Sequence, residues 1–266
     1  QAGRTDFIAR RAAIHLAGME GAQTVDLISI QHLGVGQRLM DINLTLKAGE
    51  MLGVIGANGA GKSTLLHCLA GIQDHQGEIH LAGTAIRTIP ERQRAQQLGF
   101  LPQSSHSAWA LTVRDVISLG RLPWNDSNAE AIAQAAAVAG VDSWLDRQVD
   151  QLSGGQQARV WLARVLAGQP RVILADEPVA SLDLFQQQNV LRLLRRYAQS
   201  GRAVMLSVHD LSLAARYCDR LCLLHEGQLL ALGKSAEVLT SAHLQQAFQI
   251  DAHIDLDSDP PIIIPR

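Results

Sequence analysis

Residues 56–63 form a glycine-rich segment whose composition suits the binding of phosphate. They read Gly-Ala-Asn-Gly-Ala-Gly-Lys-Ser, which fits the pattern of a glycine, four residues and then Gly-Lys-Ser. Glycines let backbone N–H groups converge on phosphate oxygens, and the helix expected after the loop presents its positive end to the same anion. The residues expected to bind nucleotide are Gly56, Asn58, Gly59, Ala60, Gly61, Lys62, Ser63 and Thr64. Lys62 would reach the outer phosphates of a bound nucleotide, and the Ser63 hydroxyl would ligate Mg²⁺.

Two carboxylates, Asp176 and Glu177, directly follow the apolar run Val-Ile-Leu-Ala of residues 172–175. Such a run is typical of a buried strand, so both carboxylates are expected at a strand end. Asp176 is placed to hold Mg²⁺, directly or through water. Glu177 is the better candidate for orienting or deprotonating the water that attacks the γ-phosphate. The alternative is an ordinary strand end that happens to carry two acidic residues.

Residues 152–156, Leu-Ser-Gly-Gly-Gln, predict the start of a second helix that could hold an anion at its N-terminus. One chain should not need two such sites for one triphosphate. We therefore expect two copies of the chain to face each other, each offering this segment to the nucleotide that the other holds. The alternative is a serine-capped helix start without a ligand.

These residues need a sheet that brings them together at one edge. Residues 51–55, 98–102, 172–175 and 203–207 are short apolar runs typical of buried strands, and helices are predicted after three of them. Helices are also expected within residues 104–165. Strand–helix alternation on both sides of this block predicts an α/β fold with a parallel-sheet core and a helical insertion.

The remaining segments suggest where the domain begins and ends. Residues 24–29 and 42–46 alternate as half-buried strands do, residues 77–83 suggest a further strand and turn, and residues 262–264 suggest a closing strand. We divide the chain into an extension over 1–24, a nucleotide-binding domain over 25–250 with its helical part at about 104–165, and a tail over 251–266. The extension is expected to be disordered or a tag remnant.

The composition is that of a folded globular chain, with 266 residues of which 47% are hydrophobic and 18% charged. Its net charge of 23 − 25 = −2 points neither to nucleic acid nor to an anionic membrane surface. No apolar run approaches the roughly 18 residues that a membrane span needs. The three cysteines, Cys68, Cys218 and Cys222, are expected to be reduced and structural, with Cys218 and Cys222 able to share a helix face.

The phosphate loop, the Leu-Ser-Gly-Gly-Gln segment and the acidic strand end resemble, in this order and spacing, the ATP-binding subunits of ABC transporters. The resemblance covers about residues 25–250. It implies a P-loop ABC ATPase fold, with a RecA-like parallel-sheet core, an antiparallel β subdomain and an inserted helical subdomain. It also implies that residues 152–156 are the family's signature segment. The residues that would contact the γ-phosphate across a head-to-tail homodimer are Ser153, Gly154, Gly155 and Gln156.

Three further positions match the family one by one. Gln103 is similar to the glutamine that senses Mg²⁺ and the attacking water and couples to the membrane subunits. Asp183, in Ser181-Leu182-Asp183, matches the loop that crosses the dimer interface. His209 matches the histidine that contacts the γ-phosphate. The resemblance thus implies three catalytic residues, Glu177, His209 and Gln103, and three metal ligands, Ser63, Gln103 and Asp176.

One motif suggests a branch of the family. Thr-Val-Arg-Asp-Val at 112–116 leads to Gly-Arg-Leu-Pro-Trp at 120–124, a pattern similar to the metal-chelate importers of iron–siderophore, haem and cobalamin. The short segments around the phosphate loop favour cobalamin slightly over the iron chelates. The aromatic residue that often stacks on adenine is absent near residues 30–36, so His32 or Leu33 is expected to pack there instead.

The resemblance implies ATP and Mg²⁺ as cofactors. It also implies integral-membrane permease subunits and, indirectly, a substrate-binding protein as partners, with no nucleic acid. The chain would lie peripherally at the cytoplasmic face of the inner membrane. Three alternatives stay open: a P-loop kinase, which would not need residues 152–156, a non-transport ABC protein, and another ABC transporter branch such as an exporter.

Overall fold

The computed structural model describes residues 25–103, 110–180 and 182–266. The predicted extension over 1–24, the start of the predicted helical block and Ser181 lie outside the described residues. The strands are β1 (Asp26–Val35), β2 (Leu39–Lys47), β3 (Met51–Ile55), β4 (Gln76–Leu81), β5 (Thr84–Ala85), β6 (Leu98–Leu101), β7 (Val172–Ala175), β8 (Ala203–Ser207), β9 (Arg220–His225), β10 (Gln228–Gly233), β11 (Ala252–Asp255) and β12 (Ile262–Pro265).

The helices alternate with the parallel strands and form most of residues 113–167. The α-helices are α2 (Lys62–Ala70), α3 (Glu91–Gln97), α4 (Val113–Ser118), α5 (Ala129–Ala139), α6 (Gly154–Ala167), α7 (Leu184–Gln199), α8 (Leu211–Tyr217), α9 (Ser235–Val238) and α10 (Ser241–Phe248). Short 3₁₀ helices are η1 (Ile86–Thr88), η2 (Leu119–Trp124), η3 (Asp142–Trp144) and η4 (Val149–Gln151). None of the helices in the described segments is both long and apolar enough to cross a bilayer.

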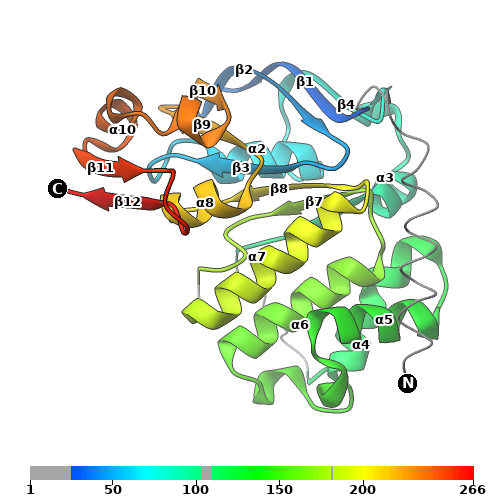
Figure 1. The fold of residues 1–266 in the computed structure, drawn as a ribbon. Coiled ribbons are helices and arrows are strands. Elements are labelled where there is room, and N and C mark those ends of the chain that lie inside the picture. The colour runs from blue at the N-terminus through cyan, green and yellow to red at the C-terminus, as the bar shows by residue number, and fades with distance from the viewer. Residues whose placement is uncertain (1–24, 104–109, 181) are drawn as a thin grey trace, which may run out of the picture.

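The central element is a six-stranded sheet in the order β10-β9-β3-β8-β7-β6, in which β9, β3, β8, β7 and β6 run parallel and β10 pairs antiparallel to β9. Strands β3, β7 and β8 are buried at every position, as expected for strands covered on both faces. A second sheet, β2-β1-β4-β5, is antiparallel. Figure 1 shows it above the parallel sheet, with α4, α5 and α6 gathered at the opposite end of the molecule. The predicted parallel core, antiparallel subdomain and helical insertion are confirmed.

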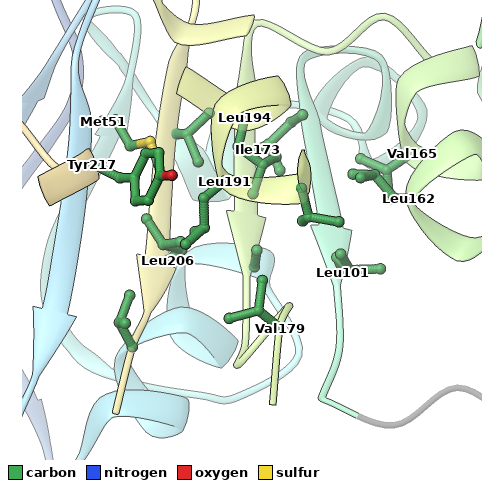
Figure 2. Packing of buried hydrophobic residues seen from close by; sticks show 14 of the residues in the cluster. Met51, Leu101, Leu162, Val165, Ile173, Val179, Leu191, Leu194, Leu206 and Tyr217 are labelled. Carbon is green, nitrogen blue, oxygen red and sulfur yellow. The ribbon is translucent and has the colours of Figure 1, made fainter. Parts of the chain in front are cut away.

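Side chains on the two faces of the parallel sheet pack into two separate hydrophobic clusters, because successive side chains of a strand point to opposite faces. Leu174 and Met205 pack with α2 and the antiparallel sheet. Ile173 and Leu206 pack on the other side with α6 and α7. Figure 2 shows Leu191 and Leu194 of α7 near Ile173 and Leu206, so α7 packs on this face of the parallel sheet.

Two expectations about the last third of the chain need correction. The predicted strand at 262–264 exists as β12, but it pairs with β11 in a separate two-stranded hairpin and closes neither large sheet. Cys218 and Cys222 do not share a helix face, because Cys218 follows the end of α8 and Cys222 lies within β9. Both thiols are free and buried, and burial raises the pKa of each to about 12, which keeps them protonated and fits their structural role.

Candidate nucleotide site

The phosphate loop joins β3 to α2 as predicted, and two of its glycines are required by its shape. Gly56 has φ 148° and Gly61 has φ 107°, conformations that side chains other than glycine rarely adopt. A Cβ at Gly56 would lie 2.3 Å from the Leu224 carbonyl oxygen, and one at Gly61 would lie 2.7 Å from the Arg38 carbonyl oxygen. The loop is therefore held between β9 and the turn that links β1 to β2.

Lys62 begins α2 and is buried inside the loop. Its Nζ donates to the carbonyl oxygens of Gly56 at 2.8 Å and Ala57 at 3.0 Å. Burial lowers the pKa of Lys62, while the nearby carboxylates of Glu177 and Asp176 act in the opposite direction. A buried ammonium with a depressed pKa gains from an incoming anion, so this position favours the binding of phosphate.

The sheet order explains how the acidic pair acquires its neighbours. Strands β6, β7 and β8 are adjacent and parallel, so the residues that follow them meet at one edge of the sheet. Gln103, after β6, donates from Nε2 to Glu177 Oε2 at 2.7 Å. His209, after β8, contacts Glu177 Oε1 through Nε2. The structure thus brings Gln103, Glu177 and His209 together, with both carboxylate oxygens of Glu177 engaged.

Ser207 is a site residue that the sequence analysis missed. Its hydroxyl donates to Asp176 Oδ1 at 2.7 Å and accepts from the backbone N–H of Glu177 at 2.7 Å. Ser207 is fully buried at the end of β8. It orients Asp176 and holds Glu177 in a backbone conformation with φ 48°, which non-glycine residues adopt uncommonly. The available signal was a polar residue at the end of an otherwise apolar strand.

The loop and the sheet edge together line a cavity of about 650 Å³. Its lining residues are Arg38, Asn58, Gly59, Gly61, Lys62, Ser63, Thr64, Gln103, Glu177 and His209. Arg38 was not expected there. The two residues predicted to pack near the adenine, His32 and Leu33, do not line the cavity: Leu33 is buried in the core, and His32 is exposed and bonded to Asp41. Gly56, Ala60 and Asp176 are buried and do not line the cavity themselves.

The signature segment occupies a different place from the cavity. Ser153 caps α6, with its Oγ accepting from Gln156 N at 3.4 Å, while Gln156 Oε1 accepts from Ser153 N at 3.0 Å. This reciprocal arrangement is a capping box. Neither Ser153, Gly154, Gly155 nor Gln156 lines the nucleotide cavity, and Ser153 and Gly154 are exposed.

Asp183 lies beside the signature segment rather than in the cavity. It caps α7, accepting from Gln186 N at 2.8 Å, and is itself exposed. The neighbouring Leu182 side chain would lie 3.3 Å from a Cβ at Gly155, so the start of α6 packs against the loop before α7. Within one chain, these predicted site residues are therefore close to each other and separate from the phosphate loop.

The residues of the cavity fit a nucleotide and its cation. The positive-φ glycines and the buried Lys62 ammonium form a concave anion site at a helix N-terminus. The Ser63 hydroxyl, the Gln103 amide and the Asp176 carboxylate offer oxygen atoms, which are the donors that Mg²⁺ prefers. Ser63 and Gln103 line the same cavity. Asp176 is close enough to Lys62 for its carboxylate to raise the pKa of that lysine.

The Gly-Arg-Leu-Pro-Trp motif has a structural explanation. Arg121 is buried in an ion pair with Asp126 at 2.6 Å and donates to the Ala167 carbonyl oxygen at 3.1 Å. Trp124 donates to the Gly168 carbonyl oxygen at 3.0 Å and lies under the Arg121 guanidinium. A Cβ at Gly120 would lie 2.0 Å from a carbonyl oxygen of α6. The motif clamps η2 onto the C-terminal end of α6 and satisfies that end's free carbonyls.

The fold and the cavity define a P-loop nucleoside triphosphatase with a parallel-sheet core. The chain matches the ABC transporter family over residues 39–180, inside the predicted domain. It is 43% identical over 216 residues to the hemin import ATP-binding protein HmuV of Rhodococcus jostii, covering 79% of this chain and 74% of that protein. HmuV of Bordetella avium is 40% identical over 234 residues, covering 83% and 90%. The chain belongs to the ABC transporter family.

Solved structures agree with this assignment. A chain from an inward-facing transporter assigned to the metal-chelate type matches with TM-score 0.78 at 28% identity, covering 91% of this chain and 98% of that one. An ATP-binding cassette solved as a dimer after hydrolysis, with ADP and Pi, matches with TM-score 0.70 at 25% identity, covering 78% and 98%. The protein is the ATPase subunit of an ABC transporter, in which ATP hydrolysis is coupled to transport.

Proposed function

We propose that this ATPase energises the import of haem. The observation that carries the proposal is the identity of 43% and 40% to hemin import ATP-binding proteins over most of the chain. The relatives give no support to the slight preference for cobalamin that the sequence suggested. Cobalamin and ferric siderophores remain the alternative cargoes, because this subunit need not contact the cargo at all.

In the proposed reaction, the phosphate loop and Lys62 bind the β- and γ-phosphates of ATP. Glu177 orients and deprotonates the attacking water. Gln103 and His209 hold the two carboxylate oxygens of Glu177, so they set the direction in which that base points. Arg38, the cavity-lining side chain from the β1–β2 turn, is the proposed contact for the nucleoside.

Three residues would hold Mg²⁺: Ser63, Gln103 and Asp176. When bound, this ion neutralises charge on the phosphate oxygens. The protein's own part is to keep these oxygen donors aligned. Ser207 does so for Asp176 through the bond at 2.7 Å, because a buried carboxylate that accepts a hydrogen bond has a defined orientation.

We propose that the working unit is a homodimer in which one chain completes the site of the other. Ser153, Gly154, Gly155, Gln156 and Asp183 would face the partner's nucleotide. Two observations support this: these residues lie together outside their own chain's cavity, and a cassette of the same fold was solved as a dimer. Loss of the γ-phosphate would then open the pair.

The proposed assembly also includes integral-membrane permease subunits and, indirectly, a substrate-binding protein. The chain would lie at the cytoplasmic face of the inner membrane, with residues 25–250 as the nucleotide-binding domain and 251–266 as a tail. Gln103 and the helical part around 104–125 would transmit the opening to the permease. The clamp of η2 on α6 supports this, since it ties that segment to the signature helix.

Uptake by intact cells tests this function. Cells lacking the protein would be complemented with the wild type, with Glu177→Gln or with the exposed control Glu78→Gln, and supplied with labelled hemin, cobalamin or a ferric siderophore. We expect hemin uptake to return with the wild type and the control but not with Glu177→Gln. Restored uptake of cobalamin or siderophore instead would contradict haem as the cargo, and restoration of none would contradict import of metal chelates.

A further inference from the structure

A second cavity, of about 720 Å³, lies between α5, α6 and α7. Figure 1 shows these three helices next to one another, away from the phosphate loop. The residues that line it come from three segments, 131–140, 159–169 and 185–202. None of these residues lines the nucleotide cavity. The volume is in the range of small-molecule sites.

The floor of this cleft is apolar. Leu162 and Leu166 come from α6, and Ala135 comes from α5. At the rim, Val138 of α5 is 53% exposed and Phe185 of α7 is 68% exposed. Large apolar side chains that stay accessible around a hollow are the features that an apolar ligand body would cover.

The charge in the cleft is of one sign. Arg159, Arg192, Arg196 and Arg202 line it, and no acidic residue does so among the described residues. In the described segments none of the four forms an ion pair with a carboxylate within 4.0 Å. This local excess stands out in a chain whose net charge is −2.

Contacts with uncharged groups hold Arg159 and Arg202 in place, and Arg192 donates to Gln188 Oε1 at 2.9 Å. Arg159 donates to the carbonyl oxygens of Ala139 and Gly140 at the end of α5. Arg202 lies over the Tyr197 ring. Arg192 and Arg196 are one turn apart on α7 and exposed, so both guanidinium groups can face the same ligand.

We propose that this cleft binds a small organic anion with an apolar body. The body would pack on the floor formed by α5 and α6, and the acidic groups would meet Arg192, Arg196 and Arg202, since guanidinium groups pair with carboxylate, phosphate or sulfonate oxygens in bidentate geometry. A ligand there touches α7, which packs on the parallel sheet, and α5, which belongs to the helical insertion. It would therefore tie these two parts of the subunit together.

The test uses the full chain and the fluorescent probe 8-anilinonaphthalene-1-sulfonate, which has an aromatic body and one sulfonate. Binding would be titrated for the wild type and for the double variant Arg192→Gln, Arg196→Gln. The matched control is Arg87→Gln, Arg114→Gln, which removes the same charge from exposed positions outside the cleft. We expect at least a tenfold loss of affinity in the cleft variant, no change in the control, and no displacement of the probe by a saturating non-hydrolysable ATP analogue.

A second variant separates binding from folding. Phe185→Glu places a negative charge at the exposed rim and is expected to weaken binding of the probe. Phe185→Leu keeps the rim apolar and should leave that affinity unchanged. Wild-type affinity in the cleft variant, or displacement by the nucleotide, would overturn the proposal. If sedimentation showed instead that Arg192→Gln, Arg196→Gln changes only the monomer–dimer equilibrium, the cleft would be an interface between copies, and the ligand site would be rejected.

Discussion

Helices α2 and α6 both begin at small residues, but the two helix N-termini have different surroundings. The start of α2 follows a fully buried strand and lies in a cavity with Lys62, Gln103, Glu177 and His209. The start of α6 is exposed, and Ser153 and its own helix satisfy each other in a capping box. The first is a site built within one chain. The second is also a helix N-terminus that could hold an anion, but its residues do not line that chain's own cavity, as a site shared between two copies requires.

This contrast shows that a helix-start motif does not by itself indicate a catalytic site. The side chains that the fold places beside the motif decide its role. Both helix starts satisfy the same local rules for capping and for dipole orientation. Only the sheet edge adds the carboxylate, the amide and the imidazole that could act on a phosphate. We therefore expect changes near the start of α2 to affect ATP binding and hydrolysis. Changes at the start of α6 should affect only turnover by the homodimer.

Removing the base should produce the largest effect. Glu177→Gln is expected to lower ATP turnover by about 10³-fold, because general base catalysis supplies 10²–10⁴, while nucleotide stays bound and the pair stays closed. Phosphate release and size-exclusion chromatography with ATP would measure this. Glu78→Gln, on an exposed strand, is the control, and undiminished turnover in Glu177→Gln would contradict the assigned role.

A change at the signature segment should leave binding intact and remove turnover. Ser153→Arg is expected to lower turnover by about 10²-fold, the usual cost of losing one donor to a developing anion. Its ATP affinity should match the wild type, since Ser153 does not line its own chain's cavity. Ser127→Arg adds the same charge at an exposed loop. A large loss of ATP affinity in Ser153→Arg would show that the two helix starts share one site.

Loss of the buried hydroxyl behind the acidic pair should have an intermediate effect. Ser207→Ala leaves Asp176 and the Glu177 N–H without their common partner, which costs about 1–3 kcal/mol for a buried polar group. We expect turnover to fall roughly tenfold and the thermal midpoint to drop. Ser118→Ala removes an exposed hydroxyl bonded to a helix carbonyl and serves as the control. Unchanged turnover and midpoint would exclude the alignment role.

The smallest effect should appear in the pH dependence of nucleotide affinity. In the proposed site, Lys62 would bind phosphate as the ammonium, and burial lowers its pKa below that of an ordinary lysine. Affinity is therefore full below this pKa and falls as pH rises through it, at a lower pH than for an ordinary lysine. We expect a loss of roughly threefold as the pH is raised through this lowered pKa, because Lys62 is one of several phosphate contacts.

The control for this titration keeps the charge at the same position. Lys62→Arg should bind with an affinity that does not change over the same range, since arginine stays protonated. An equal fall in both proteins would assign the titration to another group. No such dependence is expected from the signature segment, which contains no titratable side chain.

Much of the fold was predictable from local sequence patterns. The predictions that were wrong depended on where the chain turns. The helix expected after the phosphate loop is α2, which Gly71 ends in the left-handed region. It was predictable because periodicity and cap residues act within a few positions. The helix face predicted for Cys218 and Cys222 was wrong, since the chain turns into β9 between them. His32 and Leu33 do not line the cavity, because the turn that reaches the phosphate loop comes later in the chain, at Arg38.

From sequence alone, the chemistry of the phosphate loop, the acidic strand end and the signature helix was determined, because each depends on residues a few positions apart. Which of them act together was decided only by tertiary structure. Gln103 and Glu177 are 74 residues apart, and His209 and Glu177 are 32 apart. They meet because β6, β7 and β8 are neighbours in the sheet. That order allows the central strands β3, β7 and β8 to be buried on both faces at once, a condition that no local pattern contains.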